Sequence, residues 1–118
     1  MKTLVIGAST NPSRYSFKAI HQLIAAGNEV VAVGLREGEV AGVKILTGKP
    51  AFENIDTVTL YIGPQHQPEY YDYILSLKPR RVIFNPGTEN PELVRLLVAH
   101  QIEAEIACTL VLLATFSY

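Results

Sequence analysis

The sequence predicts an α/β domain built on an open, doubly wound parallel sheet. Short β-branched apolar runs recur along the chain, segments with helical spacing separate them, and the first run leads directly into Gly7 and a polar turn. Strands of parallel sheets appear as continuous apolar runs because helices cover both of their faces. The expected strand order is 3-2-1-4-5, and a ligand site is expected at the carboxyl ends of the strands, where this order reverses.

Four apolar runs are expected to form the main strands: residues 4–6, 30–33, 58–62 and 81–84. Each is short, rich in β-branched residues and free of strict alternation, which favours strands buried on both faces. A further strand is expected near residues 103–107. Residues 43–46 are expected as a minor edge strand, because glycines break the surrounding segment into short pieces.

Helices are expected between these runs. Phe17, Ile20 and Ile24 recur at helical spacing, with Ser13 available as an N-cap and Gly27 with Asn28 as a stop. This segment is therefore predicted to be the first crossover helix.

Two later helices have their own boundary signals. Tyr70, Ile74 and Leu77 repeat the helical spacing until Pro79 prevents continuation. Asn90 and Pro91 supply an N-cap and a first-turn proline. The stripe that follows them is Leu93, Leu96, Leu97 and His100, and residues 109–114 are expected to add a short terminal helix.

Composition and charge narrow the class of protein. The chain has 118 residues, 48% hydrophobic and 18% charged, which is typical of one globular domain spanning residues 1–118. Ten basic and 11 acidic residues give a net charge of −1, so binding to nucleic acid or to an anionic membrane is not expected. The apolar runs are too short for a signal or a membrane span, and Cys108 is the only cysteine. A cytoplasmic protein is expected.

The loop after the first strand has the chemistry of a phosphate site. Backbone N–H groups at the start of a helix favour an anion, and Arg14 can add a bidentate charge. Only Gly7 fits the dinucleotide fingerprint, because Ser9 and Pro12 replace its second and third glycines. This disfavours a tightly packed NAD pyrophosphate. A wider polar loop that binds phosphate and a turn without a ligand both stay open. The side chains that can donate in the first case are Ser9, Thr10 and Asn11.

The end of the second strand carries Gly34, Leu35 and Arg36, where an NAD enzyme usually has an acidic residue for the ribose hydroxyls. A basic residue suits a ribose phosphate, either the 2′-phosphate of NADP or the 3′-phosphate of coenzyme A. A solvated surface arginine explains Arg36 equally well.

The loop Ile62-Gly63-Pro64 exposes backbone to a ligand, because Gly63 has no side chain and tolerates unusual dihedral angles. It is a candidate lining for an adenosine or pantetheine channel. Residues 85–88 end the next strand on the same edge. For both loops a tight turn without a ligand is the alternative.

No catalytic constellation accompanies these loops. The chain lacks a Gly-x-Ser-x-Gly elbow, a Walker sequence and a His-Glu-x-x-His motif. His21, His66 and His100 are far apart in the sequence, and Cys108 is expected as a small buried apolar residue. We therefore expect a binding module without catalytic residues or a metal site.

Several short motifs, taken in order, resemble the CoA-binding domain family, the Rossmann-like module also found as the N-terminal domain of the succinyl-CoA synthetase alpha subunit. They are Gly7-Ala8-Ser9 with Pro12 and Arg14, Arg36 after the second strand, Val40-x-Gly42, Gly48-x-Pro50-x-Phe52, Ile62-Gly63-Pro64 and Asn85-Pro86-Gly87. The resemblance covers nearly the whole chain. It departs at Gly34-Leu35, where many members have Asn-Pro.

The resemblance implies a small stand-alone Rossmann-like protein that binds CoA or an acyl-CoA. In the synthetase the phosphorylated histidine belongs to a second domain, so ligase activity is not implied. The candidate binding residues are Gly7, Ser9, Thr10, Asn11, Arg14, Tyr15, Arg36, Ile62, Gly63 and Pro64.

Three alternatives stay open. An NADP-binding oxidoreductase or a nucleotide sensor would use the same sheet edge and the same basic residue. A partner subunit of an acyl-CoA synthetase or acyltransferase is a further candidate. The apolar tail, residues 110–116, is compatible with a homodimer and with packing on its own sheet.

Overall fold

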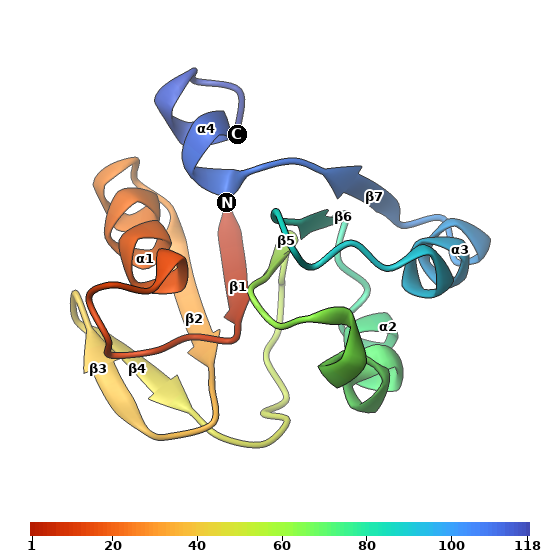
Figure 1. The fold of residues 1–118 in the computed structure, drawn as a ribbon, viewed down its shortest axis with the longest axis horizontal. Helices are drawn as coiled ribbons and strands as arrows, with labels where there is room; N and C mark the ends of the chain where they lie inside the picture. The colour runs from red at the N-terminus through yellow and green to blue at the C-terminus, as the bar shows by residue number, and fades with distance from the viewer.

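Buried apolar strands form the centre of the structure, a computed structural model that describes residues 1–118. All seven strands belong to one sheet, ordered β3-β4-β2-β1-β5-β6-β7 (Figure 1). They are β1 (Lys2–Ile6), β2 (Glu29–Val33), β3 (Gly38–Val40), β4 (Val43–Leu46), β5 (Thr57–Leu60), β6 (Arg81–Phe84) and β7 (Glu103–Ile106). Every neighbouring pair except β3 with β4 is parallel. The expected α/β class is confirmed.

The strand order reverses between β1 and β5. When the parallel strands β1, β2, β4, β5 and β6 are numbered 1 to 5 in chain order, their order in the sheet is the expected 3-2-1-4-5. It does not hold for the four long apolar runs alone, because the third of these runs, β5, pairs with β1 rather than lying beyond β2. The switch point therefore lies at the carboxyl ends of β1 and β5.

The segment after β2 differs from the expectation of one minor edge strand. β4 pairs in parallel with β2, so it lies inside the sheet, and β3 forms the edge in antiparallel pairing with β4. Ala41 and Gly42 join β3 to β4 with φ angles of 51° and 81°. Positive φ at both central residues is the geometry of a two-residue hairpin that follows the twist of its strands.

Helices cover both faces of the sheet and make three layers (Figure 1). On one face α1 (Tyr15–Ala25) packs with α4 (Thr109–Ala114), and on the other lie α2 (Tyr71–Leu77) and α3 (Pro91–Ala99). Two short 3₁₀ turns, η1 (Pro64–His66) and η2 (Pro68–Tyr70), precede α2. Each face has its own apolar cluster; α1 contributes Ile20 and Leu23 to one, and α2 and α3 contribute Ile74 and Leu97 to the other.

The first helix departs from the expectation at its start and on its buried face. Ser13 is not its cap: the N-cap is Arg14, which makes no side-chain capping bond, and the Ser13 N–H donates to Asn11 Oδ1 at 3.0 Å. The buried stripe is Ser16, Ala19, Ile20 and Leu23, whereas Ile24 is exposed. At the other end Gly27 and Asn28 stop the helix as expected, with N–H groups bonded to Ile24 O and Leu23 O.

The later helices follow the sequence signals. The Asn90 side chain caps α3 by accepting from the N–H groups of Glu92 and Leu93, and α4 spans the expected residues. His100, expected on the apolar stripe of α3, is exposed beyond its last turn. Cys108, expected to be buried, is only partly so and precedes α4. None of the helices is both long enough and apolar enough to span a bilayer.

Candidate functional site

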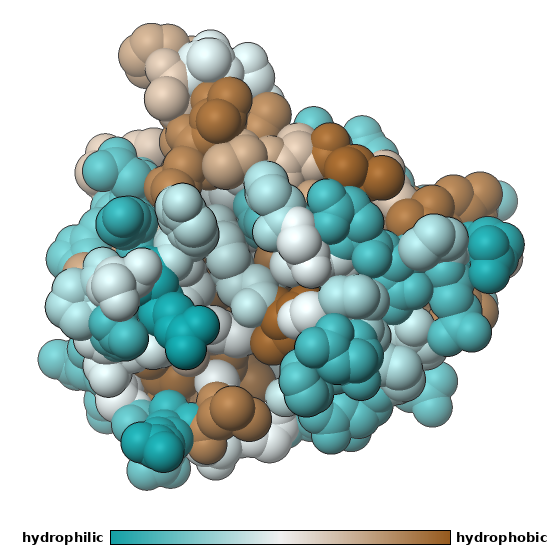
Figure 2. Space-filling view, in the orientation of Figure 1, coloured by the Kyte–Doolittle hydropathy of each residue, from teal (hydrophilic) through white to brown (hydrophobic).

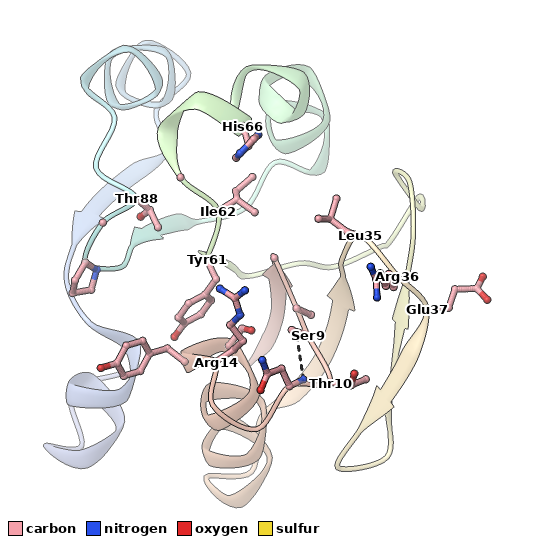
Figure 3. A pocket seen from close by; sticks show the side chains of 18 residues that line it. Ser9, Thr10, Arg14, Leu35, Arg36, Glu37, Tyr61, Ile62, His66 and Thr88 are labelled. Carbon is pink, nitrogen blue, oxygen red and sulfur yellow. Dashed lines mark hydrogen bonds between the residues drawn. The ribbon is translucent and has the colours of Figure 1, made fainter.

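A cavity lies at the carboxyl edge of the sheet, on the loops after β2, β1, β5 and β6 (Figure 3). Its volume is about 770 Å³, within the range of small-molecule sites. Because parallel strands end at the same edge, four loops that are far apart in the sequence meet here. The switch point thus carries a cavity of ligand size.

The loop between β1 and α1 offers unbonded backbone donors. The N–H groups of Gly7 and Ala8 are not free, because both donate to Val33 O, at 2.9 and 3.0 Å. The N–H groups of Ser9, Thr10, Tyr15 and Ser16 make no hydrogen bond within the protein, and all four residues line the cavity. Free N–H groups at the start of an 11-residue helix favour an anion.

Side chains within this loop fix its shape. Ser9 Oγ accepts the Asn11 N–H at 3.1 Å, and Asn11 Oδ1 accepts the Ser13 hydroxyl at 2.7 Å. This turn delays the start of α1 to Tyr15. The missing side-chain cap leaves the first helical N–H groups available to a ligand.

The loop after β2 lies close against the loop after β1. A Cβ at Gly34 would come within 2.3 Å of Ala8 O, and one at Gly38 within 2.5 Å of Thr10 Cγ2. Glycine at position 34 is therefore required by the approach of the two backbones.

Two arginines supply the positive charge of the cavity. Arg14 comes from the start of α1 and Arg36 from the loop after β2, and they approach the cavity from different sides (Figure 3). Both are exposed and neither forms an ion pair with a carboxylate. Glu37 also lines the cavity, but its carboxylate points away from the centre in Figure 3. An anionic ligand would meet two uncommitted guanidinium groups.

The loops after β5 and β6 are held together by a buried glutamine. Gln67 is fully buried, and its Nε2 donates to Ile62 O at 3.0 Å and to Thr88 O at 2.7 Å. Its Oε1 accepts from Asn90 Nδ2 at 2.9 Å. The backbone that lines this half of the cavity is therefore fixed before any ligand arrives.

Asn85 anchors the carboxyl end of β6. Its Nδ2 donates to Thr59 Oγ1 and Leu60 O, at 2.6 and 2.9 Å, and its Oδ1 accepts the Thr109 N–H at 2.8 Å. The side chain joins β5, β6 and α4 at one buried point. It positions the next three residues, Pro86, Gly87 and Thr88, on the cavity wall.

Tyr61 and His66 line the cavity without an evident chemical role. The Tyr61 hydroxyl is buried, and burial raises its pKa to about 12, so the phenol stays protonated at neutral pH. The His66 side chain forms no hydrogen bond or ion pair, and lies near Ile62 in Figure 3. No three His, Cys, Asp or Glu side chains gather where they could hold a metal.

The fold brings nine of the ten sequence-predicted residues to this cavity: Gly7, Ser9, Thr10, Asn11, Arg14, Tyr15, Arg36, Ile62 and Gly63. Pro64 does not line it, because it begins η1. Sequence reasoning missed Ser16, Glu37, His66 and the buried Gln67. For His66 and Gln67, only the strand order, which sets the loops after β5 and β6 side by side, shows their proximity to the cavity.

Comparison with known families gives one match. A family described as "CoA binding domain" matches residues 1–114, nearly the whole chain. No curated protein matches the chain.

Among solved structures, an uncharacterized protein is 50% identical to this chain and covers 99% of it, with 97% of its own length aligned and a TM-score of 0.96. A protein from Thermus thermophilus is 21% identical, with a TM-score of 0.87 over 99% of this chain and 90% of its own.

A larger protein shares the fold over part of its length. It is the dinucleotide-forming acetyl-coenzyme A synthetase 1 of Ca. Korarchaeum cryptofilum, solved with phosphate and ADP. Its identity to this chain is 18%, with a TM-score of 0.71, and the alignment covers 87% of this chain but only 25% of the synthetase.

Proposed function

This chain belongs to the CoA-binding domain family, and from that membership we propose that it binds coenzyme A, free or acylated, in the cavity at the carboxyl edge of its sheet. One observation carries the proposal. The unbonded N–H groups of Ser9, Thr10, Tyr15 and Ser16 lie in the same cavity as two arginines without carboxylate partners. CoA carries a pyrophosphate and a 3′-phosphate, which need such donors and charges.

We assign the pyrophosphate to the loop between β1 and α1. The free N–H groups there and the hydroxyl of Thr10 are the donors, and the Arg14 guanidinium supplies charge. The nearby dipole of α1 adds to the attraction. Asn11 shapes the loop through its bonds to Ser13 and keeps its Nδ2 for the ligand.

Arg36 is assigned to the 3′-phosphate. It follows the strand whose end normally selects the ribose partner, and its guanidinium is uncommitted. Ile62 and Gly63 then border the pantetheine arm, with Gly63 presenting backbone without a side chain. Pro64 supports this border from η1.

We propose a binding protein that performs no reaction by itself. The cavity contains one histidine, His66, without a carboxylate partner, and two phenols, Tyr15 and Tyr61, and burial raises the pKa of Tyr61 to about 12. None of the three forms a hydrogen bond with a second group that could accept or supply a proton, as general acid–base chemistry requires.

NADP is the competing ligand, because its 2′-phosphate would suit Arg36 as well. Identification of the bound nucleotide separates the two. The purified protein is denatured, and the released small molecules are analysed by mass spectrometry, followed by calorimetric titration of ligand-free protein with CoA and NADP. We expect CoA or an acyl-CoA and tighter binding of CoA. Release of NADP without CoA, or preferential binding of NADP, contradicts the proposal.

A partner-subunit role is a second candidate, since the fold of this chain recurs within one quarter of an acetyl-coenzyme A synthetase. A pull-down from native lysate, with and without CoA, tests it. Recovery of a nucleotide-grasp protein favours this role. If no nucleotide-grasp protein is recovered either with or without CoA, the stand-alone binding protein is the better account.

A further inference from the structure

We propose that the cavity holds CoA by its phosphorylated end and leaves the thiol end open to solvent beside the loop after β6, so that CoA and its thioesters bind alike. This inference rests on the proposed function and states which part of the ligand the protein recognises. The protein would recognise the nucleotide and phosphates, whatever acyl group the sulfur carries.

The charges of the cavity set the direction of the ligand. Strand order places the loops along the cavity in the sequence β2, β1, β5, β6. Arg36 and Arg14 belong to the first two loops, as do all four unbonded N–H groups. The phosphates of CoA are all at its nucleotide end, so this end lies over β2 and β1, and the pantetheine arm runs toward β6.

The length of the cavity agrees with this direction. Neighbouring strands lie about 4.8 Å apart, so the edge from β1, whose loop is assigned the pyrophosphate, to β6 spans roughly 10 Å. An extended pantetheine arm is long enough to cross this distance. The sulfur therefore comes to lie beside Pro86, Gly87 and Thr88, the lining residues of the last loop.

That end of the cavity has no apolar chamber. The large apolar side chains of the lining are Tyr15, Leu35, Tyr61 and Ile62, and none of them comes from the loop after β6. A Cβ built at Gly87 meets no atom within 4 Å, so the space beside it is open. The alkyl chain of an acyl group strengthens binding only through the apolar area that it removes from water. At this open end of the cavity the chain stays hydrated.

A more apolar hollow exists elsewhere but cannot receive the chain. It is lined by Ile24, Val30, Val43 and Phe52 among others. Most of its strand residues belong to the amino-terminal halves of β2 and β4, and it shares no lining residue with the cavity. The hollow is therefore separate from the cavity.

Reactivity of the bound thiol tests the proposal directly. The variant Cys108→Ser removes the only protein thiol, and calorimetry first establishes that it binds CoA. With the variant at about fifty times its Kd, about 2% of the CoA is free. We expect the CoA thiol to react with Ellman's reagent at a rate within about threefold of free CoA. A rate lower by tenfold or more overturns the proposal.

An affinity series gives a second readout. We expect the Kd values of CoA, acetyl-CoA and octanoyl-CoA to agree within about threefold. Octanoyl-CoA binding tenfold or more tightly than CoA overturns the proposal; loss of that gain in Ile106→Ser would then place the chain on the exposed end of β7. If CoA itself does not bind wild-type protein, the proposed function fails as well, so the two failures are distinguishable.

Discussion

At the scale of single residues, the cavity depends on a few side chains that the rest of the protein leaves uncommitted. Arg14 and Arg36 have no carboxylate partners, whereas Arg80 and Arg81 are paired with Asp56 and Glu105. A guanidinium without a partner on a cavity wall is available to an anionic ligand.

Arg36→Ala should weaken CoA binding by about one to two orders of magnitude, because a charge-assisted hydrogen bond contributes roughly 1.5–3 kcal/mol. Dephospho-CoA, which lacks the 3′-phosphate, should bind both proteins nearly equally. Calorimetric titration of each protein with each ligand measures the difference.

The matched control is Arg95→Ala, which removes an exposed arginine on α3, outside the cavity. It should leave both affinities unchanged. Equal losses for CoA and dephospho-CoA in Arg36→Ala would show that Arg36 supports the loop and does not contact the phosphate.

Gly7→Ala should destabilise the protein by at least about 1 kcal/mol more than Gly48→Ala. Both glycines have positive φ, 94° and 76°, so both substitutions carry backbone strain. Only at Gly7 does a Cβ also collide, at 2.8 Å from the carbonyl of Tyr61. Urea unfolding of the two variants tests this, and equal midpoints would contradict the role of the close approach.

At the scale of elements, the polar residues at the ends of β6 and α3 join secondary structures that are distant in the sequence. Asn90 caps α3 through its Oδ1, while its Nδ2 donates to the buried Gln67. One side chain thus stabilises a helix and the loop after β5.

Substitution of Asn90 should show two separable losses. Asn90→Ser keeps a capping oxygen and loses the amide donor, and Asn90→Ala loses both. We expect a loss of about 1 kcal/mol from the cap and about 1–3 kcal/mol from the unpaired Gln67 oxygen. Urea midpoints should therefore fall in the order wild type, Asn90→Ser, Asn90→Ala. Equal midpoints for the two variants would mean that the cap contributes nothing.

The sequence signals succeeded where one local feature decides an element. Residues 81–84 and 109–114 were predicted with the bounds that the structure shows, and Asn90 with Pro91 marks the start of α3. They failed where a distant or competing contact decides. Ser13 is drawn into the Asn11 turn and does not cap α1.

The β3–β4 hairpin shows the same limit. Its turn places Ala41, which has no special preference for positive φ, in a left-handed conformation. No turn signal stronger than Gly42 marks it. The position of β4 inside the sheet follows from pairing with β2, which the segment alone does not reveal.

At the scale of the whole molecule, an ion pair at the amino edge of the sheet links stability to pH. Asp56 accepts two hydrogen bonds from Arg80, at 3.0 and 3.1 Å. These bonds hold the pKa of Asp56 below its ordinary value of 3.8, although partial burial opposes them. The ionised carboxylate therefore stabilises the fold at pH values above 3.8, and this contribution is lost as the pH falls through the lowered pKa of the folded state.

Asp56→Asn should reduce the loss of stability in acid. The effect should be below roughly 1 kcal/mol, because the Arg80 partner is half-exposed and the pair is screened by solvent. Urea unfolding of both proteins from about pH 6 to about pH 3 measures it. An unchanged pH dependence in the variant would contradict the role of this carboxylate.

Self-association through the C-terminal region stays a prediction. Leu113 and Tyr118 pack on the core beneath α1, whereas Ile106, Val111 and Phe116 are exposed. Figure 2 shows apolar surface over α4 and near the end of β7. We expect light scattering at high concentration to give twice the chain mass of 13.0 kDa, and Val111→Asp to give a monomer. A monomeric wild type, with and without CoA, would contradict the dimer.

The sequence also led to most of the cavity, since nine of its ten candidate residues line it. The loops after β1 and β2 carry polar and basic residues that indicate phosphate chemistry. His66 and Gln67 carry no such signal, and their place depends on how η1 packs against the loop after β6. The charged half of the site was therefore predictable, and the neutral half was not.

A crystal structure of the protein with CoA tests the central claim most directly. We predict the pyrophosphate on the N–H groups of Ser9 and Thr10, and the 3′-phosphate within hydrogen-bond distance of the Arg36 guanidinium, about 2.7–2.9 Å. The pantetheine arm should cross Ile62 and Gly63 toward Gly87. CoA bound away from the carboxyl edge, or crystals that stay empty at saturating CoA, would contradict the account.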